Sequence, residues 1–414
     1  MIKIKLEVLN IKGHQMNKCC YKHKLLPNEE LIESEESCQF DVEELILVDG
    51  KYFCQFHCPV INDQKELTEK GMWNDEKIDR FNDDFFEVIG ITDDREFTGE
   101  GKVDDFRGVV FPGEIDFSDV QFKAPVDFSN CEFIGESYFT DAVFSDDVIF
   151  TYSTFRKSTN FYNCRFDRGL DFLYCMVLES INFQYTNKSD HEDQEERQVI
   201  KTINMSDSVF IGDAYFDNRE FKGKTDFRRC TFSTAPSFYG CELHQETFFP
   251  PFSNFLDTSS SEAFQKYRVL RLSMENVRNR VDEGSFFALE QRSLRLSSGF
   301  ADKYLSLSFI YEKCSLYGTS VSRPMIILLC FLSFFSFNYY YFFDIEFVEA
   351  VEFSIQQVVR PFTSWNSKEA EYLGKIFIIS DFFALRLIAT LQSLVSLMLI
   401  ALSILAARWR FKRG

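Results

Sequence analysis

The 414-residue sequence is short of positive charge and of catalytic motifs. Lys and Arg number 45 against 64 Asp and Glu, which gives a formal net charge of −19. Binding to nucleic-acid phosphates needs the opposite balance, so we expect no nucleic-acid partner. The chain has no G-x-S-x-G, phosphate-binding loop or H-E-x-x-H motif. We therefore predict no catalytic and no cofactor-binding residues, and expect a protein that is not an enzyme.

A secretory signal and a disulfide framework are also missing. The first residues, MIKIKLEVLNIKGHQ, are polar and mixed, unlike the apolar core of a signal peptide. The 12 cysteines do not follow the spacing of a secreted disulfide scaffold. We therefore expect a reducing compartment, in which cysteines are small core residues or metal ligands.

Phenylalanine is the residue in excess, with 49 copies against 17 Tyr and 3 Trp. Two ladders alternate at spacings of five and six residues, so the full period is eleven. The first ladder is Phe106, Phe117, Phe128, Phe139, Phe150, Phe161, Phe172 and Phe183. The second is Phe111, Phe122, Phe133, Phe144, Phe155 and Phe166, then Val177. Both resume in phase after a break, which predicts a repeat architecture.

A third ladder lies two residues before the second one. Its members are Val109, Val120, Cys131, Ala142, Ser153, Cys164 and Cys175, then Ser208, Arg219, Cys230 and Cys241. Apart from Arg219 these residues are small, and a large and a small inward position together fill a narrow tube at protein density. Asp or Asn precedes many of the aromatic residues, which is typical of tight turns. We expect the five ladder cysteines to be buried core residues.

These features resemble the pentapeptide-repeat family, over about residues 106–250. The resemblance implies a mainly β fold, a right-handed quadrilateral β-helix with one repeat on each face and two eleven-residue units in each coil. The sixth residue inserted in alternate repeats departs from the family pattern and predicts a bulged corner. The polar segment 187–198 interrupts the ladders, and we interpret it as a solvated loop rather than an acidic contact patch.

Two apolar segments near the C-terminus are long enough to cross a bilayer, residues 324–343 and 387–407. Arg323 precedes the first segment and a basic tail follows the second, so the positive-inside rule predicts a multi-pass protein of the inner membrane with both termini cytoplasmic. Between the spans an amphipathic segment places Phe347, Val351, Ile355 and Val358 on one face. It is expected to lie on the outer surface or to re-enter the membrane.

The N-terminal region is rich in metal-ligating residue types. Two C-x-x-H units, Cys20/His23 and Cys54/His57, supply four ligands suited to tetrahedral zinc. With four ligands no position stays open, so the predicted zinc is structural. Cys19, Cys38 and Cys58 are competing ligands, and a set of free thiols is the alternative.

The expected organisation is an N-terminal Cys/His module, a β-helix, an α-helical linker and a transmembrane hairpin. Their ranges are 1–95, 96–255, 256–322 and 323–414. In the linker, Tyr267, Leu270, Met274, Val277 and Val281 predict a helix with one apolar seam. The phrases YRVLRLSMEN and LYGTSVSRP look like the linker of membrane-bound bacterial pentapeptide-repeat proteins.

The leading functional hypothesis is a membrane-anchored, non-enzymatic scaffold or sensor that uses a cytoplasmic β-helix to bind a protein partner, whose identity the sequence does not give. The alternative is an oligomeric two-helix pore gated by the β-helix, but the chain lacks a TVGYG-like filter. Some pentapeptide-repeat proteins mimic DNA and occupy topoisomerases, a role that fits poorly with a membrane anchor. The membrane and a second copy of the chain are the other expected partners.

Overall fold

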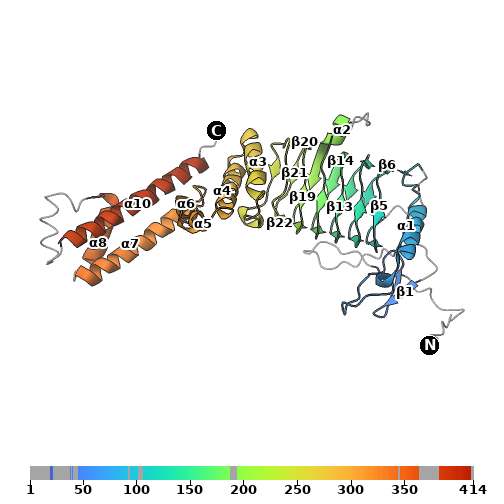
Figure 1. The fold of residues 1–414 in the computed structure, drawn as a ribbon, viewed down its shortest axis with the longest axis horizontal. Coiled ribbons are helices and arrows are strands. Elements are labelled where there is room, and N and C mark those ends of the chain that lie inside the picture. Colours follow the sequence, from blue (N-terminus) through green and yellow to red (C-terminus); the bar gives the residue numbers. More distant parts are fainter. Residues whose placement is uncertain are drawn as a thin grey trace. The chain divides into compact units, whose positions relative to one another are not determined.

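The computed structural model describes residues 19–21, 38, 40, 45–91, 94–100, 106–186, 194–343, 346–362 and 382–411 (Figure 1). The chain divides into two compact units, residues 1–256 and 257–414. The first contains the Cys/His module and a β-solenoid of about six turns over residues 96–248. The second contains the linker helices and both apolar helices. The structure thus confirms the predicted β-helix, while the four-domain division stays a prediction.

The solenoid has four faces, each built from parallel strands of successive coils. The first face comprises β3 (Glu96–Phe97), β6 (Gln121–Phe122), β10 (Val143–Phe144), β14 (Arg165–Asp171), β17 (Val199–Asn204) and β20 (Glu220–Phe221). The second comprises β7 (Val126–Asp127), β11 (Val148–Ile149), the ends of β14 and β17, β21 (Thr225–Asp226) and β23 (Thr247–Phe248). Because β14 and β17 run through the corner, these two faces join into one 10-stranded sheet.

The other two faces are separate sheets of six and five strands. The six-stranded sheet comprises β4 (Val110–Phe111), β8 (Glu132–Phe133), β12 (Thr154–Phe155), β15 (Met176–Val177), β18 (Val209–Phe210) and β22 (Thr231–Phe232). The five-stranded sheet comprises β5 (Ile115–Asp116), β9 (Ser137–Tyr138), β13 (Thr159–Asn160), β16 (Ile181–Asn182) and β19 (Ala214–Tyr215). Strand arrows of neighbouring coils therefore lie side by side along the solenoid in Figure 1.

Stacked phenylalanine rings fill the interior, as the two ladders predict. Phe122 packs on Phe144 at a ring-centroid distance of 4.8 Å and 1° between planes, and Phe128 on Phe150 at 5.0 Å and 4°. The side chains of the small ladder pack in the interior and also donate hydrogen bonds to backbone carbonyls. Cys164 Sγ donates to Phe139 O at 2.8 Å and Ser153 Oγ to Phe128 O at 2.6 Å, so interior carbonyls are hydrogen-bonded.

The corners follow from the same repeat. At one set, an Asp or Asn oxygen accepts the N–H two residues later, as Asp116 does from Ser118 at 2.8 Å. In the same turns, the residue before each small-ladder member has a left-handed backbone, with φ of 59° at Asn130 and 56° at Asn163. Asn and Asp adopt this conformation at lower cost than other non-glycine residues. These left-handed residues lie in the five-residue intervals of the ladders, such as Phe128 to Phe133, whereas the inserted sixth residue belongs to the other corners, such as that between Phe122 and Phe128.

Of the polar segment 187–198, which we interpret as a solvated loop, the structure describes residues 194–198, and residues 187–193 lie outside the described part of the chain. Its end forms α2 (Gln194–Gln198), and Arg197 is buried. Arg197 donates to the carbonyl oxygens of Asp141 at 2.9 Å and Asn163 at 3.0 Å. The fully buried Arg219 guanidinium donates to the carbonyls of Cys164, at 2.9 Å, Phe183 and Arg197. Arg197 and Arg219 thus hydrogen-bond the backbone carbonyls of the coils at the place where the 187–198 segment leaves the solenoid.

The linker consists of four helices rather than one long helix. They are α3 (Ala263–Asn276), α4 (Arg280–Leu296), α5 (Phe300–Leu305) and α6 (Leu307–Ser315). The predicted apolar seam ends at Met274, because the chain turns at Arg278, whose φ is 60°. Asn279 then caps α4 by accepting the Asp282 N–H at 3.2 Å, and Val281 is 58% exposed. The seam residues Tyr267 and Leu270 are buried, and α3 packs along α4.

The hairpin contains α7 (Ser322–Phe343), α8 (Phe347–Val359) and α10 (Phe382–Phe411). Helix α8 contacts both long helices, but not through the apolar face that the sequence predicts. Phe347 and Ile355 of that face are 55% and 47% exposed, whereas Ser354 and Gln357 are fully buried. The reason is the polar content of α10, since Gln392 donates to Ser354 Oγ at 2.7 Å and Ser393 to Gln357 O at 3.2 Å.

Candidate metal centre

A β-hairpin and the turn after it provide two of the candidate ligands. Strands β1 (Leu45–Val48) and β2 (Lys51–Cys54) are joined by Asp49 and Gly50, both with positive φ, as a two-residue hairpin turn requires. Cys54 ends β2, and the chain turns so that the N–H groups of His57 and Cys58 bond to Cys54 O at 3.2 and 2.9 Å. This turn brings the Cys54 thiol and the His57 imidazole together at 3.3 Å.

Cys19 and Cys38 complete a group of four, in which all ligand atoms lie within 4.8 Å of one another. The Cys38 and Cys54 sulfurs are 3.6 Å apart, and the Cys19 sulfur is 3.7 Å from His57 Nδ1. In tetrahedral zinc sites the metal–sulfur and metal–nitrogen distances are about 2.3 and 2.0 Å, so edges of roughly 3.5–3.8 Å are expected. The spacing of the four atoms therefore fits a tetrahedral ion.

Surrounding groups hold the ligands in orientations suited to a metal. His57 Nε2 donates to Arg107 O at 3.0 Å, which leaves Nδ1 with its lone pair facing the thiols. The Cys54 N–H donates to Cys19 Sγ at 3.3 Å. Tyr21 stacks on the imidazole at 4.1 Å and 8°. The hydrogen bond to Arg107 O and the stacking of Tyr21 fix the orientation of the His57 ring. The hydrogen bond from the Cys54 N–H places the Cys19 sulfur beside the other candidate ligands.

The thiols perturb one another strongly. Hydrogen bonds from Cys38 and Cys54 lower the pKa of Cys19, whereas bonding to Cys19 raises the pKa of Cys38 to about 12 and also raises the pKa of Cys54. Three thiols thus favour one thiolate among them. A divalent cation would accept all three as thiolates, which is the usual way in which such a cluster is stabilised.

The sequence predicts Cys20, His23, Cys54 and His57 as ligands, and the structure brings two of these together. Cys54 and His57 belong to the group, while Cys20 is exposed beside Cys19. His23 lies outside the described residues. Cys19 and Cys38, named only as competing ligands, take the other two places. The buried Cys58 is not a member, and its Sγ contacts Pro59 O at 3.5 Å.

The candidate metal-binding group sits where the module meets the first coil of the solenoid. The Val110 N–H donates to Phe56 O at 2.8 Å, and the buried Lys70 Nζ donates to Val110 O at 2.6 Å and Gln55 O at 2.5 Å. Burial lowers the pKa of Lys70 to about 7. Helix α1 (Asp75–Ile89) adds Phe85, whose ring meets Phe111 edge-on at 5.1 Å. The module therefore caps the first coil, as a repeat array needs.

Comparisons with known proteins agree with this architecture. Residues 106–154 and 128–176 match the family model described as pentapeptide repeats (9 copies). No curated protein and no solved structure matches the chain. Two helices, Ser322–Phe342 and Phe383–Arg408, are long and apolar enough to cross a membrane.

Proposed function

We propose that this pentapeptide-repeat protein is a membrane-anchored, non-enzymatic scaffold or sensor whose solenoid binds a protein partner. The observation that carries the proposal is the filled interior of the solenoid, in which Phe rings stack from coil to coil. Recognition therefore falls to the outer surface of a rigid array, in a chain with a net charge of −19. A regular acidic surface suits a partner with a basic face.

The anchor is the hairpin of α7 and α10. In their most apolar windows only 22% and 33% of residues are buried, whereas the core helix of a soluble protein would be mostly buried. Leu329 and Leu394 are 61% and 53% exposed, as expected for contact with lipid. Arg323 and Arg408 flank the spans. These charges support a multi-pass protein of the inner membrane with both termini cytoplasmic.

Site-specific photo-crosslinking in the full chain tests the scaffold. A crosslinking residue at Met176 or Ile211, which are 44% and 45% exposed on the solenoid, is expected to give a discrete protein adduct in native membranes. The same residue at Leu391, 56% exposed on α10, is the control and should give no protein adduct of that mass. Absence of adducts from every outward solenoid position tested would contradict the scaffold.

We further propose that the group of Cys19, Cys38, Cys54 and His57 binds a structural zinc ion. Three thiolates and one imidazole are typical zinc ligands, and the four of them close the coordination sphere. A closed sphere leaves no position for substrate, so the metal would stabilise the cap rather than catalyse a reaction.

A second candidate function is the gated pore, and the packing of α8 favours it. Helix α8 turns apolar side chains such as Val348 and Val359, 73% and 71% exposed, outward and buries Ser354 and Gln357 against the spans. Ala350 and Phe353 are buried as well, so α8 packs a mixed face against the spans and exposes apolar side chains, which fits a segment that re-enters the bilayer. A defined oligomer that conducts in planar bilayers would support the pore, whereas a silent monomer would leave the hairpin as an anchor.

A further inference from the structure

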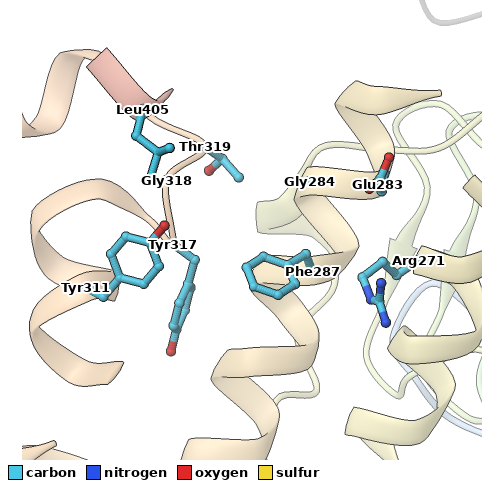
Figure 2. A pocket seen from close by; sticks show the side chains of 9 residues that line it. All are labelled: Arg271, Glu283, Gly284, Phe287, Tyr311, Tyr317, Gly318, Thr319 and Leu405. Carbon is cyan, nitrogen blue, oxygen red and sulfur yellow. The ribbon is translucent and has the colours of Figure 1, made fainter. Parts of the chain in front are cut away.

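A cavity of about 350 Å³ lies within the second unit, between the linker helices and the end of α10 (Figure 2). Its walls come from α3, α4, the end of α6 with the turn after it, and Leu405 of α10. The volume falls in the range of small-molecule sites. Neither the scaffold nor the metal centre uses this space.

Aromatic rings form the body of the cavity. Tyr311 and Tyr317 meet at a centroid distance of 5.7 Å and an interplanar angle of 85°, so they make an angled corner. Figure 2 shows the Phe287 ring projecting toward this corner from α4. Aromatic walls on two sides offer stacked and edge-on positions to an inserted ring.

The two charged residues that line the cavity, Arg271 and Glu283, each form an ion pair with a neighbouring residue. Glu283 Oε2 accepts from Arg280 at 2.7 Å, and Arg271 pairs with Glu290 at 2.7 Å and with Glu275 at 3.7 Å. Each charge that lines the cavity is therefore already compensated by a neighbour. A ligand with a net charge would have to compete with these pairs, so the lining favours a ligand without one.

The turn that forms one wall is strained. Leu316, Tyr317 and Gly318 follow one another with φ of 49°, 55° and 83°. A left-handed conformation at a non-glycine residue costs on the order of 1–3 kcal/mol, and such strain concentrates at functional sites. Gly318 has the φ that suits glycine, and a Cβ there would be strained and would lie 2.5 Å from Tyr311 Oη. Tyr317 is 4% exposed and bonds to Ser308 Oγ at 3.2 Å, which holds its ring against the cavity.

We propose that this cavity binds a small molecule with a planar ring and no net charge. The ring lies between Phe287 and the corner of Tyr311 and Tyr317, and polar atoms of the ligand face Glu283. Because the same ligand also touches Leu405, it joins the linker helices to the end of the second apolar helix. The site rests on its own geometry and requires neither the scaffold nor the pore.

Binding of indole to the full chain in lipid nanodiscs, measured by saturation-transfer NMR with empty nanodiscs subtracted, tests the proposal. Indole is uncharged and planar, and saturable binding is expected. Phe287→Trp should fill the cavity and weaken binding at least tenfold. Leu294→Trp, at a position 46% exposed on the same helix, is the matched control and should bind as the natural chain does.

A second substitution, on the wall formed by α10, separates the loss of the binding site from the loss of the fold. Leu405→Trp is expected to weaken indole binding as well, and the melting temperature of each variant shows whether it is folded. Equal binding by folded Phe287→Trp and Leu405→Trp chains, or no saturable binding above partition into lipid, would overturn the proposal. So would a stoichiometric lipid, detected by mass spectrometry, that co-purifies with the natural chain and is lost in both variants.

Discussion

At the scale of single residues, Cys54 is the centre of the metal group. Its sulfur lies 3.6 Å from the Cys38 sulfur and 3.3 Å from His57 Nδ1, and the His57 N–H points at it from 3.4 Å. The side chain is fully buried, so solvent does not reach this candidate ligand. Loss of this one sulfur removes one of the four candidate ligands and an acceptor of the His57 N–H.

Cys54→Ser is expected to lose the metal, while Cys20→Ser keeps it. Cys20 neighbours Cys19 in the sequence but is exposed and outside the group, which makes it the matched control. Metal analysis of purified chains should give about one zinc per natural or Cys20→Ser chain and almost none for Cys54→Ser. Limited proteolysis should then cut the module faster in Cys54→Ser. Equal zinc in the two variants would contradict the assignment.

The sequence predicts half of this group for a physical reason. A C-x-x-H turn after a hairpin places both ligands on one local structure, so Cys54 and His57 can be found from spacing alone. The choice between the adjacent Cys19 and Cys20 depends on which sulfur accepts the Cys54 N–H, and Cys38 arrives from a distant segment. Such long-range contacts leave no local pattern in the sequence.

Asp282 gives a pH-dependent prediction in the linker. Burial raises the pKa of this carboxyl from 3.8 to about 6, against a smaller opposing effect of its hydrogen bond from Asn279. The folded state therefore binds the proton more tightly than the unfolded state, and stability falls as pH rises from about 4 to 6. Asp282→Asn removes this loss and should stabilise the unit by on the order of 1–2 kcal/mol at pH 7.

Unfolding of the full chain in detergent, followed at several pH values, checks this. The midpoint of Asp282→Asn should exceed that of the natural chain at pH 7, and the difference should shrink toward pH 4, where both side chains are uncharged. A difference that stays constant over this range would show that the carboxyl does not titrate as its burial implies.

At the scale of elements, the solenoid shows why one arginine stands in a ladder of small residues. The ladder needs small side chains where each coil stacks on the last, and the coil interrupted after residue 186 leaves its carbonyls without a thiol or hydroxyl donor. Arg219 supplies these hydrogen bonds with one guanidinium, which is fully buried. Burial lowers its pKa to about 10, so it stays charged at neutral pH.

Arg219→Ala is expected to destabilise the solenoid by about 3 kcal/mol or more, because it leaves several buried carbonyls unsatisfied and opens a cavity. Arg229→Ala is the matched control, since Arg229 is exposed and pairs with Asp207 at the surface. Its unfolding midpoint should equal that of the natural chain. Denaturant unfolding monitored by circular dichroism separates the two variants, and equal midpoints would contradict the role of Arg219.

The sequence predicts the coils but not the hydrogen bonds of Arg219 to the interrupted coil. The period of eleven, the two aromatic ladders and the small ladder together specify which residues point inward, because each position repeats with one side-chain size. Arg219 is visible only as an exception to that pattern. Its partners come from Phe183, Cys164 and Arg197, whose positions depend on how the chain leaves and rejoins the wall. The packed face of α8 is hidden for a similar reason, since the polar residues of α10 select it.

At the scale of the whole molecule, the proposed topology places α8 and the linker on opposite sides of the membrane. Glu349 of α8 and Ser298 after α4 are both exposed. A membrane-impermeant maleimide applied to intact cells should label Glu349→Cys but not Ser298→Cys. Ser298→Cys should react only after the membrane is opened. The natural chain sets the background from its own cysteines, and labelling of Ser298→Cys in intact cells would overturn the topology.

The direction of the hydrogen bonds between coils has a mechanical consequence. In a parallel solenoid these bonds run along its axis, as from Gln121 N to Arg95 O and from Val143 N to Val120 O. Tension along that axis would load the coils in series, so the chain would peel off one coil at a time. Compression instead would press the stacked rings together. A rod of this kind held at a membrane would resist pushing far more than pulling.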